Sequence, residues 1–166
     1  MAKLLRSARS AIIKLNNHDT EGRCQKIFAM NREIKFRGKR SINNEWVYGN
    51  YILIAGRQET FISESYSCTS SHAFEVKPES VGQFTGLYDA NEKEIYEQDI
   101  IRFHFNGSEY ILCVIFNNEV GAWCVAYKGS EYVGIRPLGE LLCEYSGMEV
   151  IGNIHDNPEL FKEEKQ

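Results

Sequence analysis

The stretch "GLYDANEKEIYEQDIIRFHF", residues 86–105, combines a polar turn with the start of a strand. Asp89-Ala90-Asn91-Glu92 has the composition of a turn, because Asp and Asn side chains hydrogen-bond to nearby backbone groups. From Ile100 to Phe105, apolar residues alternate with Arg102 and His104, which is the period-2 pattern of a strand. Asn106-Gly107 follows and is a strong hairpin signal. The stretch therefore predicts a turn followed by the first strand of a β-hairpin.

The same signals continue in both directions along the chain. Strands are predicted where apolar and β-branched runs lie between turns, at 33–37, 46–54, 60–63, 75–76, 81–85, 110–116, 122–127, 132–136 and 148–154. Short helices are predicted at Pro137 to Cys143 and from Pro158 to about Glu164, with Asn157 as the N-cap. The fold class is mainly β. A meander this short is expected to curl into a small barrel of the SH3-like type, which removes exposed edges.

The charge divides the chain into two parts. Residues 1–29 carry six basic and two acidic residues, so the net charge of −4 leaves residues 30–166 at −8. Apolar residues of the first part recur near helical spacing, and we interpret 1–29 as an extension outside the core. The alternative is a docking or regulatory arm. Residues 30–166 form the predicted β-rich domain, with N-terminal strands in 30–64, a polar loop at 65–71, and the barrel and terminal helix in 72–166.

Composition and motifs argue against several classes of protein. The chain has 43% hydrophobic residues, enough for a core, but no run approaches the roughly 20 apolar residues of a membrane span. Five irregularly spaced cysteines favour buried thiols in a reducing cytoplasm over a disulfide framework. The sequence lacks CxxC, Walker and GxGxxG motifs, so we expect neither a metal nor a cofactor.

Three pairs of side chains could suggest catalysis or metal binding, and none is convincing. Asp99 and His104 are five positions apart in one strand, which places them on opposite faces and about 16 Å apart. Glu94 and Glu97 have the look of a carboxylate pair, but a glycosidase needs a cleft and a set separation. A hairpin at Asn106-Gly107 would place His104 opposite Glu109 and leave no four-ligand set with Cys113. We therefore expect no enzymatic activity.

Four segments carry a resemblance to a known family. They are "MNREIKFRGK" (30–39), "VGQFTGLYDANEKEIYEQDIIR" (81–102), "VIFNNEVGAWCV" (114–125) and "EVIGNIHDNPEL" (149–160). Together they resemble the YopX family of phage and prophage proteins over about residues 30–160. The resemblance implies a β-rich fold with a small C-terminal barrel and a homo-oligomer, and it implies no established activity. Glu92 and Gln98 stand where the family tends to have glycine, so the backbone at these two turns is expected to differ.

Two functional hypotheses follow. The first is a cytoplasmic phage or prophage accessory protein that binds a host or phage protein without catalysis. The second is a nucleic-acid-associated protein that uses the basic segment 1–29. Aromatic residues could stack on bases, but the −8 charge of residues 30–166 opposes phosphate binding; these aromatics are Trp46, Tyr48, Phe103, Trp123 and Tyr127. The predicted binding residues for the first hypothesis are Tyr88, Asp89, Tyr96 and Glu97, because tyrosines with polar tips are common at interfaces.

Overall fold

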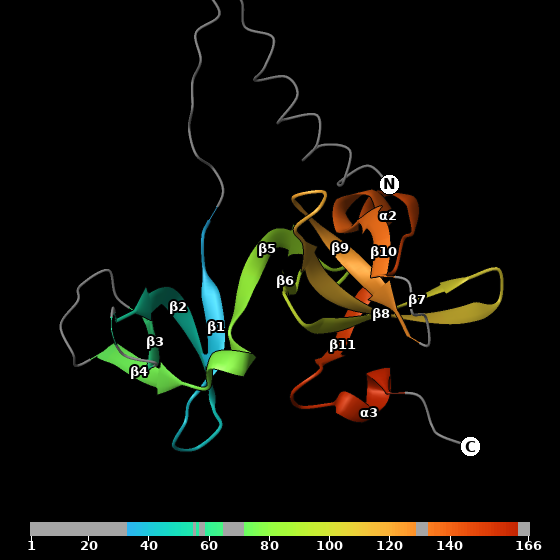
Figure 1. Cartoon of the computed structure of the whole chain (residues 1–166). Coiled ribbons are helices and arrows are strands. Elements are labelled where there is room, and N and C mark those ends of the chain that lie inside the picture. Colours follow the sequence, from blue (N-terminus) through green and yellow to red (C-terminus); the bar gives the residue numbers. More distant parts are fainter. Residues whose placement is uncertain (1–32, 55, 57–58, 65–71, 129–132, 163–166) are drawn as a thin grey trace, which may run out of the picture. The chain divides into compact units, whose positions relative to one another are not determined.

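The computed structural model describes residues 33–54, 56, 59–64, 72–128 and 133–162. The chain divides into two units, 1–31 and 32–166, and every described element belongs to the second unit (Figure 1). The basic segment 1–29 and the polar loop 65–71 lie outside the described residues.

The described strands form two antiparallel sheets, which confirms the mainly β prediction. The first sheet has the order β4-β3-β2-β1-β5-β6, with β1 at Phe36–Lys39, β2 at Trp46–Leu53, β3 at Thr60–Ser63, β4 at Ala73–Val76, β5 at Gly82–Tyr88 and β6 at Glu94–Tyr96. The second has the order β10-β9-β8-β7-β11, with β7 at Asp99–Phe105, β8 at Ser108–Asn117, β9 at Ala122–Tyr127, β10 at Val133–Pro137 and β11 at Glu149–Asn153. The helices are the 3₁₀ turn η2 at Pro78–Ser80, α2 at Leu138–Glu144 and α3 at Pro158–Phe161.

The first sheet curls so that the end of β1 meets the outer strand β4. An isolated bridge joins Arg40 to Val76, and the Ser41 amide donates to the Glu75 carbonyl at 3.0 Å. Gly38 permits this approach, since a Cβ built on it would lie 3.0 Å from the Cβ of Val76. Close backbone approach of this kind favours glycine.

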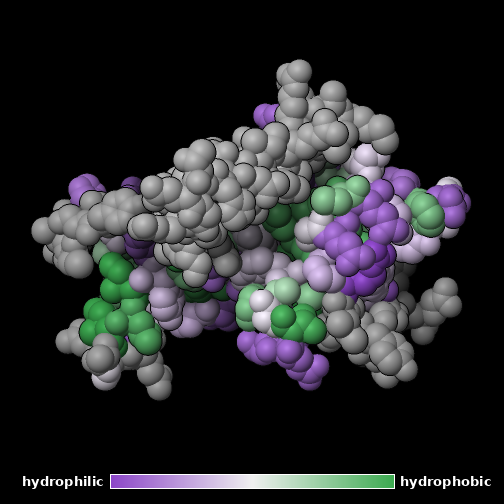
Figure 2. Space-filling view, turned by 90° about the horizontal axis from the view of Figure 1, so that it is seen from above, coloured by the Kyte–Doolittle hydropathy of each residue, from purple (hydrophilic) through white to green (hydrophobic). Residues whose placement is uncertain are grey.

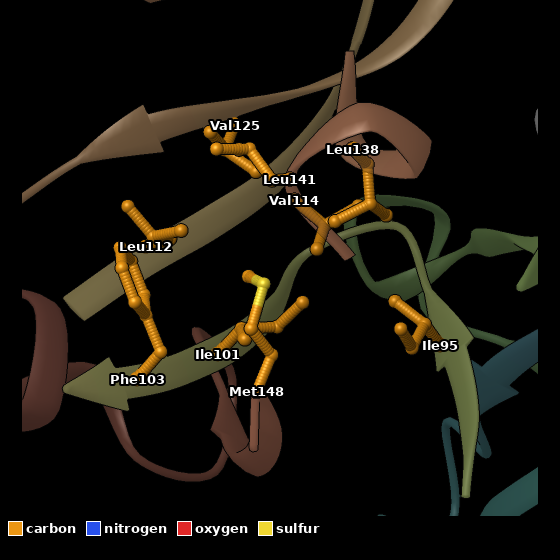
Figure 3. Close-up of a cluster of buried hydrophobic side chains, with 9 residues drawn as sticks. All are labelled: Ile95, Ile101, Phe103, Leu112, Val114, Val125, Leu138, Leu141 and Met148. Atoms are coloured by element: carbon orange, nitrogen blue, oxygen red, sulfur yellow. The ribbon is translucent and has the colours of Figure 1, made fainter. Parts of the chain in front are cut away.

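The second sheet is open, and the predicted small barrel is wrong. Among the described strands, β10 pairs only with β9, and β11 pairs only with β7. Helix α2 contacts β9 and β10, and its Leu138 and Leu141 are fully buried in the core (Figure 3). The helix therefore covers the apolar face that the far wall of a barrel would have covered. The N-terminal part of the predicted barrel region, β4 to β6, belongs to the first sheet.

The main hydrophobic core lies against the second sheet and includes one strand of the first. Figure 3 shows its nine buried side chains converging from β6, β7, β8, β9, α2 and the residue before β11; they are Ile95, Ile101, Phe103, Leu112, Val114, Val125, Leu138, Leu141 and Met148. Ile95 of β6 is fully buried in this cluster. Because β6 also pairs with β5, it links the two sheets through backbone hydrogen bonds and through the core.

Local boundaries differ from the sequence prediction by a few residues in many elements, and most clearly at β5, β6 and α3. Strand β5 continues past the predicted end at Thr85 to Tyr88, and β6 forms where only a connection was expected. Helix α3 ends at Phe161, and Asn157 occupies the N-cap position without a side-chain capping hydrogen bond. None of the described helices has the length and apolar character needed to cross a membrane.

Candidate functional site

Tyr88 ends strand β5 and Asp89 follows it, and their side chains have different environments. Asp89 is buried, and its Oδ1 accepts hydrogen bonds from the amides of Asn91 at 2.8 Å and Lys93 at 2.9 Å. Its Oδ2 accepts from the Val150 amide of β11 at 2.9 Å. The carboxylate is thus directed to backbone groups that close the turn and hold it against β11. Tyr88, in contrast, is 51% exposed.

Tyr96 and Glu97, the other two predicted binding residues, lie at the end of β6. Tyr96 is buried, and its hydroxyl donates to Glu94 Oε2 at 2.8 Å. Burial and the neighbouring Glu94 raise the pKa of Tyr96, so the phenol stays neutral. Glu97 is half-buried, which raises the pKa of its carboxyl. Of the four predicted residues, Tyr88 offers the most side chain to solvent.

Two of these tyrosines belong to a continuous row of four aromatic rings, which we call the aromatic row: Tyr48, Tyr96, Phe84 and Tyr88. Successive ring centroids are 5.7, 5.5 and 5.5 Å apart, with edge or tilted geometry. Such pairs are favourable beyond the area that they bury. Tyr96 and Phe84 in the middle are 3% and 2% exposed, whereas Tyr48 and Tyr88 at the ends are 46% and 51% exposed. The row therefore presents two solvent-exposed rings on a buried aromatic base.

Polar groups flank the row and fix its rings. Lys35 Nζ lies 5.3 Å from the Phe84 ring centroid and 2.6 Å from Glu94 Oε1. Burial opposes the charged forms of both residues, but their mutual hydrogen bond raises the pKa of Lys35 and lowers that of Glu94. Glu94 therefore binds Lys35 and the Tyr96 hydroxyl at once.

A buried ion pair lies on the other side of Tyr96. Arg37 Nη1 donates to Asp99 Oδ1 at 2.7 Å, and its guanidinium is 4.7 Å from the Trp46 ring centroid and 4.9 Å from that of Tyr96. Both charged residues are buried, and Arg37 Nε lacks a hydrogen-bond partner in the described part of the chain. Asp99 Oδ2 accepts from the Tyr96 amide at 2.8 Å. Burial raises the pKa of Asp99, although Arg37 and this amide act to lower it.

The loop after β11, residues 154–157, meets the same cluster. Asp156 forms an ion pair with Lys39 and accepts a hydrogen bond from the Trp46 indole at 2.6 Å. Burial acts to raise the pKa of Asp156, but the hydrogen bonds from Lys39, Asn153 and Trp46 lower it to about 2. The cluster thus joins β1 and β2 of the first sheet to the end of the second.

The side chains that the sequence suggested as catalytic or metal-binding pairs interact with other residues instead. Asp99 pairs with Arg37, while exposed His104 lies opposite Glu109 in the β7–β8 ladder, as predicted. Glu94 pairs with Lys35. Burial raises the pKa of the Cys113 thiol to about 12, which disfavours the reactive thiolate. Among the residues that the structure describes, no three His, Cys, Asp or Glu side chains are grouped to hold a metal.

Several cluster residues were missing from the predicted site: Lys35, Arg37, Phe84 and Asp156. The positions of Lys35, Arg37 and Phe84 depend on the pairing of β1 with β5, in which Phe36 lies opposite Gln83 and Arg37 opposite Gly82. Alternation predicts each strand but not which distant strand it pairs with. The cations at alternate positions 35, 37 and 39, next to aromatic-rich strands, were the available signal. Of the five aromatics considered for base stacking, Tyr48 is exposed, Phe103 is buried and the others are half-buried.

The chain is similar to a known protein family and to a solved structure. The family model described as YopX protein matches residues 35–162. No curated protein matches the chain. Among solved structures, the crystal structure of protein EF1440 from Enterococcus faecalis is 21% identical with a TM-score of 0.48, and the match covers 78% of this chain and 99% of that chain.

Proposed function

Because this chain belongs to the YopX protein family, we propose that it is a phage or prophage accessory protein of the host cytoplasm. It acts by binding a host or phage protein and performs no catalysis. The exposed ends of the aromatic row, Tyr48 and Tyr88, form the centre of the binding surface.

The observation that carries this proposal is the contrast within the row. Tyr48 and Tyr88 expose about half of their surface, while the rings of Tyr96 and Phe84 beneath them are buried. A tyrosine held by neighbouring rings loses little conformational freedom when a partner covers it. Its ring supplies apolar contact area and its hydroxyl supplies a hydrogen bond, which is why tyrosine is frequent among energetic hot spots.

The polar residues near the row support binding over catalysis. The carboxylates of Asp89, Glu94 and Asp99 already accept hydrogen bonds from backbone amides, Lys35 or Arg37. A general base must reach the proton that it abstracts from a substrate, and these groups are directed at the protein itself. They hold the strands that carry the rings.

Affinity capture from infected or lysogenic cells tests the proposal, with the full chain as bait. A variant with Tyr48→Ser and Tyr88→Ser should capture its partner about 10-fold less well, because two hot-spot rings are removed. The matched control combines Phe105→Ser and Phe116→Ser, since these rings are 43% and 40% exposed but lie in the second sheet. The control should capture the partner as well as the wild type does.

Three results would contradict the proposal. Equal capture by the wild type and the Tyr48/Tyr88 variant would exclude the aromatic row as the binding surface. Loss of the captured protein after nuclease treatment would favour the nucleic-acid hypothesis. Capture of nothing but further copies of this chain, with light scattering showing that the tyrosine variant becomes monomeric, would make the row a self-association surface instead.

A further inference from the structure

His155 lies where the two sheets meet, and its ring is held from two sides. Its Nε2 donates to the side-chain oxygen of Gln98, in the turn between β6 and β7. Gln98 Nε2 is directed the other way, to the Glu79 carbonyl at 3.5 Å, which fixes the amide orientation. The His155 and Trp46 rings meet in a T-shaped arrangement, with centroids 6.1 Å apart.

The loop that carries His155 depends on few contacts with the first sheet. Asp156 binds Lys39 of β1 and the Trp46 indole, and Asn153 Oδ1 accepts from the amides of His155 at 3.0 Å and Asp156 at 2.9 Å. The Asn153 contacts shape the loop itself. At its start, the Ile154 amide donates to the Gln98 carbonyl at 3.1 Å. Beyond Ile154, the described contacts with Gln98, Lys39 and Trp46 are made by the side chains of His155 and Asp156.

The charges around His155 make its protonation unfavourable. Charged groups on the neighbouring elements act on its pKa: Arg37 and Lys39 from β1, Asp156 from the same loop and Glu79 from η2. Because Nε2 already carries the hydrogen donated to Gln98, an added proton binds at Nδ1. Burial lowers the pKa of His155 below 6.5, and the two cations lower it further, while the two carboxylates oppose them.

We propose that His155 is a proton-operated latch, which holds residues 155–157 against β1 and β2 when neutral and releases them when a proton binds at Nδ1. Protonation places a third positive charge beside Arg37 and Lys39, and moving the loop outward separates these charges. Release also breaks the hydrogen bond between Asp156 and the Trp46 indole. The sheets stay folded, because the main core and the backbone ladders contain no part of this loop.

The indole signals of the two tryptophans test the latch by NMR. Trp46 Nε1 donates to Asp156, whereas Trp123 Nε1 is buried without a partner among the described residues. On acidification of the full chain, the Trp46 indole signal should move toward the position of an unbonded indole, with a midpoint below 6.5. The Trp123 signal should stay in place. Asp156, with a pKa of about 2, remains ionised throughout this range.

Two variants complete the experiment. His155→Gln keeps a neutral donor for Gln98 but cannot bind the proton, so the movement of the Trp46 signal should disappear. His104→Gln, at an exposed histidine in the β7–β8 hairpin, should leave the movement unchanged. A stationary Trp46 signal in the wild type, or the same movement in His155→Gln, would overturn the proposal. Simultaneous collapse of all signals would also overturn it, because a latch releases only its loop.

Discussion

The two sheets are stabilised in different ways. The second sheet packs against a core of nine buried side chains, closed by two leucines of α2. The core of the first sheet has three fully enclosed residues, Val47, Ile62 and Val76, with Phe36, Phe74 and Val81 at its border. A core this small buries little apolar area, which limits the stability that it can supply alone.

Exposed apolar residues show the same contrast. More of them lie in the first sheet and its connections, namely Ile34, Ile42, Tyr48, Tyr51, Leu53, Ile54 and Tyr88, than in the second, namely Phe105, Phe116 and Val120. Figure 2 shows hydrophobic residues at the side of the described region where β2 to β4 lie. The first sheet thus leaves apolar surface uncovered, and the buried Arg37–Asp99 ion pair adds to the link that β6 makes with the main core.

The largest effect should follow from breaking the buried ion pair. Asp99→Asn leaves the Arg37 charge buried beside a neutral amide, and removal of one partner of a buried pair costs about 3–5 kcal/mol. The free energy of unfolding should therefore fall by about this amount, as measured by urea denaturation.

Two further variants separate charge from packing at this position. Replacing both partners, Arg37→Leu with Asp99→Leu, should recover much of the stability, because neither charge is then left unpaired. Glu140→Gln removes one of the two carboxylate partners of Arg136 at an exposed site and should change little. If Asp99→Asn also changes little, the ion pair contributes nothing to the attachment of the first sheet.

The two cores can be compared directly with a matched pair of isoleucines. Ile101 in the main core and Ile62 in the small core are both 0% exposed. Truncation to alanine costs about 2–5 kcal/mol, depending on how far the surroundings collapse into the cavity. The loss of unfolding free energy should lie near the upper end of this range for Ile101→Ala and near the lower end for Ile62→Ala. Ile62 has fewer buried neighbours, so its removal leaves fewer side chains unsupported. Urea unfolding of both variants provides the measurement. The dependence of the free energy of unfolding on urea concentration must be the same for the two variants.

The result also tests how strongly the sheets are coupled. A single transition at a lower midpoint for both variants indicates one cooperative domain, as expected from the position of Ile95 and β6. An equal decrease in the free energy of unfolding for the two isoleucine variants would show that the small core is as rigid as the large one. The two sheets would then not differ in the way that their cores suggest.

Local sequence signals predicted strands better than they predicted their arrangement. The β7–β8 hairpin could be predicted because strict alternation and Asn106-Gly107 act over a few residues, and His104 does lie opposite Glu109. The open second sheet could not be predicted, because no local sequence signal shows that Leu138 and Leu141 of a seven-residue helix enter the core. Closure of a meander and its covering by a helix both remove exposed apolar surface, and the sequence alone does not distinguish them.

The candidate site shows the same limit. Tyr88 and Tyr96 were recognised as tyrosines near a turn, but the aromatic row depends on Phe84 lying opposite Tyr96 across the β5–β6 ladder. Asp89 had the composition of an exposed turn residue, yet its carboxylate is buried by the approach of Val150 from 61 positions away. Contacts of this range follow from topology, which periodicity does not specify.

The smallest effect concerns Glu92 and Gln98, which stand where the family tends to have glycine and where a different backbone was expected. Glu92 and Gln98 have φ angles of 62° and 68°, so both adopt the left-handed backbone that glycine favours. Such a conformation costs a non-glycine residue about 1–2 kcal/mol, and the greater freedom of glycine in the unfolded chain offsets part of any gain. Glu92→Gly, at an exposed turn, should therefore raise the free energy of unfolding by about 0.5 kcal/mol.

Gln98→Gly should give a different result, because Gln98 joins the two sheets. It relieves the same backbone strain but removes the hydrogen bonds to His155 and the Glu79 carbonyl, worth about 1 kcal/mol each at most. We therefore expect no increase in the free energy of unfolding for Gln98→Gly. Gln98→Ala should lower it, because alanine keeps the backbone strain and removes the side-chain contacts. If Gln98→Gly stabilises the protein as much as Glu92→Gly does, the Gln98 side chain contributes nothing to the junction, and the two turns are equivalent.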